Sequence, residues 1–313
     1  MNIDTKKNIR PDSPGAPVTL KDAGNILEIR YMKTTHSVPI QKINNDIGVD
    51  LRTGEVIEFQ HKENRSEDKA SVAQSLRKLR DLINANLADP KKALWITLTY
   101  AENMTDPNRL YQDYRKFWQK IRRYLTKHKY PKAEYIAAAE PQGRGAWHMH
   151  CLFLFSEKAP FIANEEIAKL WGHGFTTTKS LSKFDNPGLY LTAYLGDMEL
   201  SDAIREGDAS GRIKTVDTKD ENGEHQKKAI VKGARLHLYP PGFNLYRCSR
   251  GVKRPVIYQT TEAKAQKIVG TAPLVYEKTF THLNDDGEII NFINFRQYNK
   301  AKRSTQEDEN CSN

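Results

Sequence analysis

The order of the elements expected between residues 94 and 180 constrains the fold more than any other feature of this sequence. The segment LWITLTY is typical of a strand, and it precedes a helix from Pro107 to about His128, the strands EYIAAAE and WHMHCLFLF, the helix NEEIAKLW and the strand GFTTTKS. Asp106 before Pro107 is a strong signal for a helix start. This order is that of a split βαβ arrangement. We therefore expect an α+β fold: an antiparallel sheet with a ferredoxin-like βαββαβ core, helices on one face and the other face free for a site.

Weaker patterns on either side of this core predict the domain organisation. Residues 1–24 and 304–313 lack apolar periodicity, so we expect a loosely ordered N-terminus and a polar tail. Residues 25–89 predict an N-terminal α+β extension, and residues 90–200 contain the core. Residues 201–303 predict a C-terminal α+β extension that is a candidate for DNA binding. The charged, glycine-containing stretch at its start, residues 200–228, predicts a helix end followed by a mobile loop.

Charge and cysteine content narrow the partners and the chemistry. The net charge is +10 and the pI is about 9.3, which favours a polyanionic partner and above all nucleic acid. The sequence shows neither an apolar run long enough to span a bilayer nor a signal peptide, so we expect a cytoplasmic protein without a membrane partner. Cys151, Cys248 and Cys311 form no CxxC pair. Any metal should therefore be held by nitrogen and oxygen.

His148 and His150 stand one residue apart in the predicted strand WHMHCLFLF, so their side chains share one face. A hairpin that pairs Glu140 with His148 would put Ala138 opposite His150 and place the carboxylate on the same face. Two imidazoles and a carboxylate can bind Mg²⁺, Mn²⁺, Fe²⁺ or Zn²⁺. The alternative is a half-buried strand whose histidines only satisfy hydrogen bonds, and a slip of one residue in the hairpin would turn Glu140 away.

Tyr190 and Tyr194 lie four residues apart in a helix predicted to start near Pro187, so they would share one side of that helix. Attack by a tyrosine on a metal-polarised phosphodiester would store the bond energy in a phosphotyrosine ester. The alternative is that both rings pack half-buried with their hydroxyls in water.

Basic residues outside the apolar stripe of the 107–128 helix and near Tyr246 predict a nucleic-acid-binding surface, because lysine and arginine contacts to phosphates supply much of non-specific affinity. A solvated charged face is the alternative for the helix. The candidate residues are Arg144, Arg115, Lys116, Arg122, Arg123, Arg247, Arg250 and Lys253.

With these residues in view, the sequence between Leu94 and Met198 resembles the HUH endonucleases, and among them the rolling-circle replication initiators (Rep proteins) of Gram-positive plasmids, phages and integrative elements. WITLTY is similar to the first motif strand of that family, and SRGVKRP is similar to a downstream stretch. The residues similar to the metal motif, the third ligand and the two-tyrosine nucleophile motif are His148, His150, Glu140, Tyr190 and Tyr194.

The resemblance implies a metal-dependent, site-specific single-strand DNA endonuclease and strand transferase of the HUH nuclease fold, with Mg²⁺ or Mn²⁺ as its cofactor. It implies a nick at an origin, a covalent 5′-phosphotyrosine, a free 3′-hydroxyl that primes replication, and later rejoining of the strand. The implied partners are origin DNA, single-stranded at the nick site, and a host helicase. Many members carry lysine where this chain has Ala193, so the positive charge there would come from elsewhere, for example Lys179 or Lys183.

Three other functions remain open at this stage. A two-tyrosine HUH transposase fits the core equally well, whereas a conjugative relaxase usually has a tyrosine near the N-terminus and a third histidine. A non-haem iron oxygenase could use Glu140, His148 and His150, but it would require neither the tyrosines nor the basic helix. A non-enzymatic module that binds single-stranded nucleic acid should show exposed aromatic residues on the sheet, where this sequence predicts histidines.

Overall fold

The computed structural model describes residues 2–4, 8–34, 40–44, 46–51, 53–59, 69–142, 145–179, 181, 188, 192, 195, 197–199, 204, 213–219, 225–231, 233–284 and 286–302. The chain forms two compact units. We call Lys62–Lys253 the central unit, and Met1–His61 together with Arg254–Asn313 the terminal unit.

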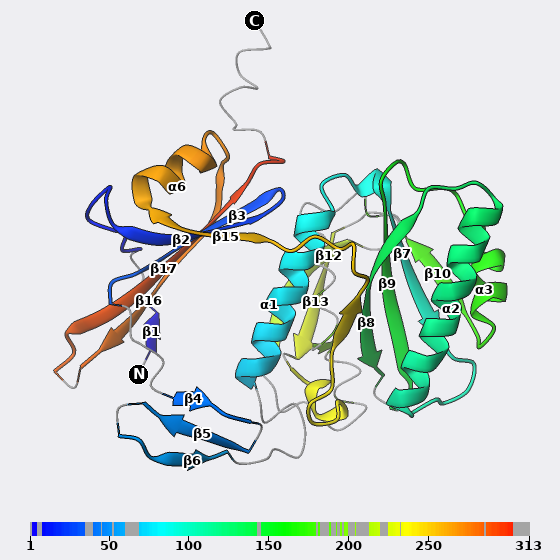
Figure 1. The fold of residues 1–313 in the computed structure, drawn as a ribbon, viewed down its shortest axis with the longest axis horizontal. Coiled ribbons are helices and arrows are strands. Elements are labelled where there is room, and N and C mark those ends of the chain that lie inside the picture. Colours follow the sequence, from blue (N-terminus) through cyan, green and yellow to red (C-terminus); the bar gives the residue numbers. More distant parts are fainter. Residues whose placement is uncertain are drawn as a thin grey trace, which may run out of the picture. The chain divides into compact units, whose positions relative to one another are not determined.

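An antiparallel five-stranded sheet forms the middle of the described central unit (Figure 1). Its strand order is β10-β7-β9-β8-β14, and all four neighbouring pairs are antiparallel. Along the chain the elements follow the order β7-α2-β8-β9-α3-β10, which confirms the predicted order of strands and helices. Their bounds are β7 Ala93–Thr99, α2 Pro107–Lys127, β8 Ala133–Pro141, β9 Trp147–Phe155, α3 Asn164–Trp171, β10 Thr176–Lys179 and β14 Tyr246–Cys248.

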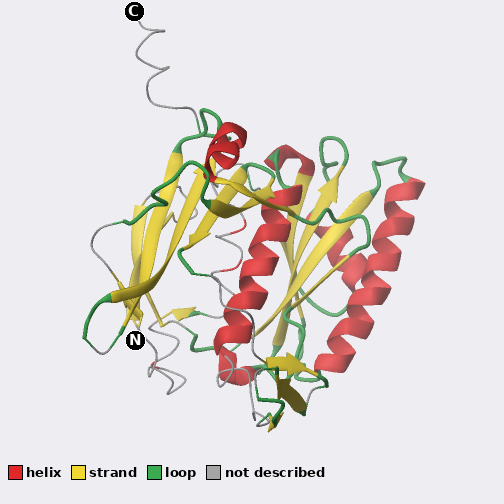
Figure 2. Cartoon of the chain, turned by 60° about the vertical axis from the view of Figure 1, so that its left-hand side comes forward, coloured by secondary structure: helices red, strands yellow, loops and turns green. Residues whose placement is uncertain are grey.

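Helices cover both faces of this sheet, so the expectation of helices on one face was wrong (Figure 1, Figure 2). Helices α2 and α3 pack on one face, where Phe117 and Trp171 join Phe153 in a buried cluster. Helix α1 (Lys69–Asn86) packs on the other face, where its leucines join Leu152 and Leu154. Residues 152–155 of β9 are apolar on both faces, and each face must be covered to remove that surface from water.

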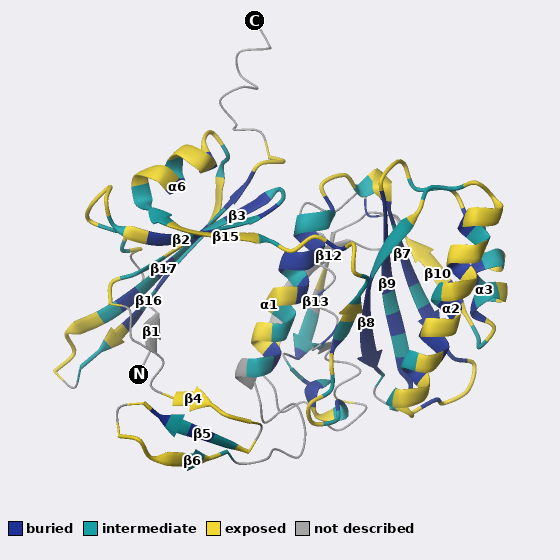
Figure 3. Ribbon diagram, viewed as in Figure 1, coloured by how far each residue is buried: buried dark blue, intermediate teal, exposed yellow. Residues whose placement is uncertain are grey.

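Helix α2 begins where the sequence predicts. The Asp106 side chain accepts a hydrogen bond from Asn108 N at 2.8 Å, and Pro107 occupies the first turn, where its missing N–H leaves no donor unpaired. Leu110, Phe117 and Ile121 are buried against the sheet, whereas the opposite side of the helix is exposed (Figure 3). The spacing of these apolar residues, three to seven positions apart, accounts for the buried stripe.

The charged segment after the core contains strands, so its expected mobile loop is corrected in part. Strands β12 (Ile213–Lys219) and β13 (His225–Val231) pair antiparallel over their whole length, and β11 (Met198–Glu199) pairs with the end of β13. Charged residues alternate with β-branched ones in IKTVDTK, so the strand shows no sustained apolar period. That composition concealed the hairpin.

The terminal unit joins residues from both ends of the chain in one antiparallel sheet of order β1-β16-β17-β3-β2-β15 (Figure 1). The sequence-based boundaries put these residues in separate extensions, and strand β2 lies in the segment expected to be loosely ordered. Helix α6 packs on this sheet through Ala265 and Val269. A smaller sheet has the order β4-β5-β6. The bounds are β1 Asn2–Asp4, β2 Pro17–Ala23, β3 Ile26–Met32, β4 Ile40–Lys42, β5 Ile47–Asp50, β6 Val56–Glu58, β15 Val256–Thr261, α6 Glu262–Val269, β16 Leu274–Leu283 and β17 Ile289–Asn299.

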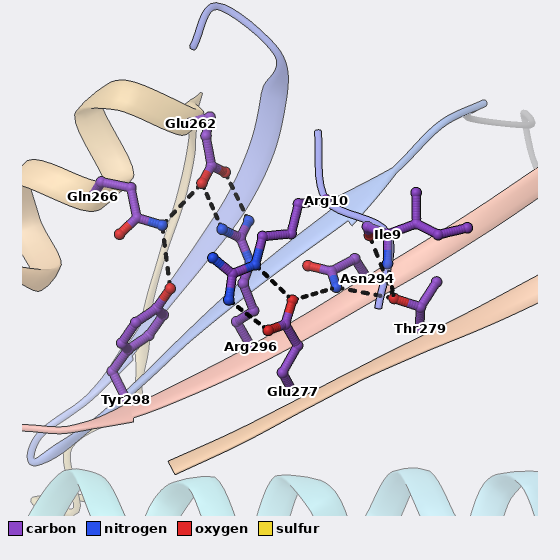
Figure 4. Close-up of polar contacts among 9 residues, drawn as sticks. All are labelled: Ile9, Arg10, Glu262, Gln266, Glu277, Thr279, Asn294, Arg296 and Tyr298. Atoms are coloured by element: carbon purple, nitrogen blue, oxygen red, sulfur yellow. Dashed lines mark hydrogen bonds and ion pairs between the residues drawn. The ribbon is translucent and has the colours of Figure 1, made fainter. Parts of the chain in front are cut away.

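A buried polar network crosses the large sheet of the terminal unit (Figure 4). Arg296 of β17, whose side chain is 1% exposed, donates to both carboxylate oxygens of Glu262 at 2.5 and 2.7 Å. Arg10 donates to both oxygens of Glu277 at 2.8 and 2.6 Å. Asn294 donates to Glu277 Oε1 at 3.1 Å. The two ion pairs therefore connect an N-terminal residue, helix α6 and strands β16 and β17.

No helix among the described residues combines the length and the apolar character that a membrane span requires.

Candidate functional site

The register of the β8–β9 hairpin brings the three predicted metal ligands to one face of the sheet. Glu140 pairs with His148, and Ala138 pairs with His150, which confirms the predicted register. Directly paired residues share a face, and residues two apart on a strand do too. Glu140, His148 and His150 therefore lie on the face that helix α1 covers, which we call the histidine face.

Contacts at the tip of the hairpin hold this register. Gln142 N donates to Ala146 O at 2.7 Å, and Gly145 N donates to Gln142 O at 2.8 Å. Gly145 has a φ of +82°, a conformation that glycine adopts without steric strain. The first residue of β9, Trp147, donates from its backbone N to Met104 O and from its ring to Thr105 O, both at 3.0 Å. These bonds fix the start of the strand that carries both histidines.

The His150 ring is held on three sides. Its Nδ1 lies 3.2 Å from Thr97 Oγ1, its Nε2 makes a very short contact with Glu140 Oε2, and its plane stacks on Trp95 with ring centroids 5.3 Å apart. Thr97 is the residue directly paired with His150 across β7 and β9. Because Thr97 engages Nδ1, the ring presents Nε2 to the carboxylate.

Glu140 is buried and stays ionised. Its side chain is 8% exposed, and Arg235 Nη1 lies 3.2 Å from its second oxygen, Oε1. Burial by itself would raise the pKa of this carboxyl, but the charge and hydrogen bond of His150, followed by the charge of Arg235 and then His148, hold the pKa below its ordinary value. Sequence reasoning did not find Arg235, because nothing in the sequence relates it to a residue 95 positions earlier.

The donor set fits a small divalent cation in its chemistry. Imidazole nitrogen and carboxylate oxygen are ligands of Mg²⁺ and Mn²⁺ sites, and Nε2 of His150 and Oε2 of Glu140 point at one another. A partner on the other ring nitrogen, as Thr97 provides, is typical of metal-binding histidines. As the side chains stand, no group of three His, Cys, Asp or Glu residues in the described part of the chain is arranged to hold a metal ion. His148 lies on the shared face as the third candidate.

Both predicted nucleophiles, Tyr190 and Tyr194, lie outside the described residues. Around them, Gly188, Thr192 and Leu195 are helical, and Thr192 Oγ1 donates to Gly188 O at 2.8 Å. Leu195 is 1% exposed and belongs to the buried cluster on the histidine face, together with Trp95, Ala138 and residues of α1. These described residues place the segment that contains the tyrosines on the histidine face.

Gly188 shows how closely this segment approaches α1. A Cβ atom at this position would lie 2.5 Å from Asn84 Oδ1 and 2.7 Å from Arg80 O, so only glycine fits against the helix backbone. Lys179, one of the two alternative sources of positive charge, is also on the histidine face, because it pairs with Trp95 and is exposed there. The other, Lys183, lies outside the described residues.

The candidate DNA-binding residues are spread over both faces of the sheet. Arg115, Lys116, Arg122 and Arg123 are exposed on α2, opposite the histidine face. The Arg247 guanidinium lies 3.7 Å from the centroid of the Tyr111 ring of α2, and thus on that same side. Lys253 exchanges backbone hydrogen bonds with Asn86 at the end of α1.

The remaining two candidates differ in what the structure describes. Arg250 is exposed after β14, and Arg144 lies outside the described residues. A nucleic acid that touches every described basic candidate would therefore have to pass around the sheet. The structure does not gather them into one patch beside the histidines.

Comparison with known proteins gives one match. Residues 93–199 match the family model of the replication-associated protein ORF2, over about a third of the chain. The matched region contains β7 to β10, the three predicted metal ligands and both tyrosines. No curated protein and no solved structure matches the chain. The family match indicates a role in replication initiation, with DNA as the partner.

Proposed function

We propose that the central unit is the HUH-type nuclease core of a rolling-circle replication initiator, which nicks one strand of origin DNA and later rejoins it. The observation that carries this proposal is the hairpin register, which brings Glu140, His148 and His150 onto one face. The strand order β10-β7-β9-β8 also agrees with a ferredoxin-like βαββαβ core. The match of residues 93–199 to a replication-associated family supports the choice of DNA as substrate.

In the proposed reaction, the phenolic oxygen of Tyr190 or Tyr194 attacks the scissile phosphorus. A bond forms between this oxygen and phosphorus while the bond from phosphorus to the 3′ oxygen breaks. The 3′ oxygen leaves with the bonding electrons and takes up a proton, and the phenolic proton passes to solvent. The products are a 5′-phosphotyrosyl strand and a free 3′-hydroxyl. Attack by a 3′-hydroxyl on the phosphotyrosine reverses the step and rejoins the strand.

The residues of the histidine face have distinct parts in this proposal. Glu140, His148 and His150 would hold Mg²⁺ or Mn²⁺, which supplies a Lewis acid for an oxygen of the scissile phosphate. Thr97 and Trp95 keep the His150 ring in one orientation. The segment from Gly188 to Leu195 brings the tyrosines to the same face. The DNA must be single-stranded at the nick, because the tyrosine has to approach the phosphorus in line with the leaving oxygen.

A nicking assay with labelled single-stranded origin DNA and Mn²⁺ tests this proposal. The parent protein should cut one phosphodiester, and His148→Ala and His150→Ala should abolish cutting while much of the DNA affinity remains, because basic residues supply that affinity. His128→Ala is the matched control, because His128 is exposed at the end of α2 and away from the histidine face. Equal cutting by the parent and both site variants would contradict the metal site.

A further inference from the structure

Arg235 connects the strand that carries Glu140 with the end of the segment that carries the tyrosines. Its Nε donates to Asp197 O at 2.9 Å, and its Nη1 donates to Pro141 O at 3.0 Å while lying 3.2 Å from Glu140 Oε1. Asp197 is held in turn by Gly233 N, which donates to its Oδ1 at 3.1 Å. A single guanidinium thus contacts a predicted metal ligand and the backbone on either side.

Tyr239 makes a second connection between the same two parts of the chain. Its hydroxyl lies 2.9 Å from Ala139 O and 2.8 Å from Leu195 O, and the residue is 1% exposed. Its ring packs against Trp147, the first residue of β9, with centroids 5.8 Å apart. Unlike Arg235, Tyr239 contacts only backbone carbonyls at this junction and no predicted metal ligand.

We propose that Arg235 and Tyr239 are positioning residues of the nicking site, an inference that rests on the proposed function. Arg235 orients the Glu140 carboxylate by holding Oε1, which leaves Oε2 toward His150. Together the two side chains fix residues 195–197, just after Tyr194, against the end of β8. Groups that hydrogen-bond to metal-ligating carboxylates commonly set their orientation and thereby the affinity of the site.

The different contacts of the two residues predict different effects. Loss of the Arg235 guanidinium should weaken metal binding, because the carboxylate loses the group that fixes its orientation. Loss of the Tyr239 hydroxyl should leave metal binding unchanged and slow the chemical step, because only the placement of the 195–197 backbone depends on it. A purely structural role would lower the melting temperature in both cases without separating these two measurements.

The experiment uses the full chain and compares Arg235→Gln and Tyr239→Phe with the parent. Mn²⁺ affinity is measured by calorimetry in the absence of DNA, and the single-turnover nicking rate is measured at saturating Mn²⁺. Lys227→Gln is the matched control, because it removes one exposed positive charge from the neighbouring strand β13. Arg235→Lys is the second variant in case the glutamine variant does not fold, since one ammonium cannot hold all three acceptors.

We expect Arg235→Gln and Arg235→Lys to bind Mn²⁺ about tenfold more weakly than the parent. Tyr239→Phe should bind Mn²⁺ as the parent does but nick roughly tenfold more slowly. Parent-like Mn²⁺ affinity in both Arg235 variants, or parent-like nicking by Tyr239→Phe, would overturn the inference. His150→Ala separates the two levels of the argument: if it binds Mn²⁺ as the parent does, the metal site and the proposed function fail as well.

Discussion

Replacing Arg296 by methionine should destabilise the terminal unit through the carboxylate that it leaves behind. Arg296 is 1% exposed and holds both oxygens of Glu262, whose side chain is 14% exposed. Without the guanidinium, Gln266 Nε2, at 2.9 Å from Oε1, remains as a donor to Glu262 among the contacts drawn in Figure 4. Removal of one partner of a buried ion pair costs about 3–5 kcal/mol.

This cost can be measured separately from the central unit. All four tryptophans of the chain lie between residues 95 and 171, within the central unit. Tryptophan fluorescence therefore follows the central unit, whereas circular dichroism follows both units. For a unit of this size, about 3–5 kcal/mol corresponds to a melting temperature roughly 10–20 °C lower. The fluorescence transition should stay where it is.

The double variant Arg296→Met, Glu262→Met distinguishes an unpaired charge from lost packing. Replacing both partners of a buried pair by apolar residues is often neutral or stabilising, so the double variant should recover most of the loss. Lys300→Met is the control, because its ion pair with Asp22 is partly exposed and should contribute about 1 kcal/mol or less. A double variant as unstable as Arg296→Met would refute the reasoning.

Three further predictions concern pH, salt and a close approach of two backbones. Hydrogen bonds from Arg10 lower the pKa of Glu277, and although burial raises the pKa of Glu262, hydrogen bonds from Arg296 and Gln266 hold it below its ordinary value of 4.5. Their stabilisation is complete above that value and lost as pH falls, so the melting temperature of the terminal unit should drop between about pH 5 and 3; a flat profile would contradict this. Replacing Arg122 and Arg123 by glutamine should reduce the slope of log affinity against log salt by about 1.4 on single-stranded DNA, and an unchanged slope would mean that this face is only solvated. Gly188→Ala should slow nicking at unchanged Mn²⁺ affinity, because its Cβ would meet Arg80 O at 2.7 Å; a fully active variant would show that this approach is not needed.

Local patterns predicted most of the elements of the central unit and half of the candidate site. The helix start at Asp106 and the alternation of His148 and His150 depend on neighbours in the sequence, so both were accessible. The β8–β9 register was also accessible, because turn residues and a shared polar face restrict it.

Features that depend on contacts between distant residues were not accessible. Arg235 reaches Glu140 across 95 positions, and the sheet of the terminal unit pairs β3 with β17, near the opposite end of the chain. Helix α1 was predicted as a helix, but its place on the histidine face follows from apolar residues of β9 that lie more than 60 positions later. The β12–β13 hairpin was missed because its charged residues hide the strand pattern.

Mapping the covalent product of cleavage tests the central claim most directly. The parent protein is incubated with Mn²⁺ and 5′- or 3′-labelled single-stranded origin DNA, and the adduct is digested and its peptides are identified by mass spectrometry. We predict a 5′-phosphate ester on Tyr190 or Tyr194, a larger loss of initial cleavage in Tyr190→Phe, and loss of part of the second strand transfer in Tyr194→Phe. The variant that lacks both hydroxyls should form no adduct and make no cut. An adduct on neither tyrosine, or continued cutting by the double variant, would contradict the proposed mechanism.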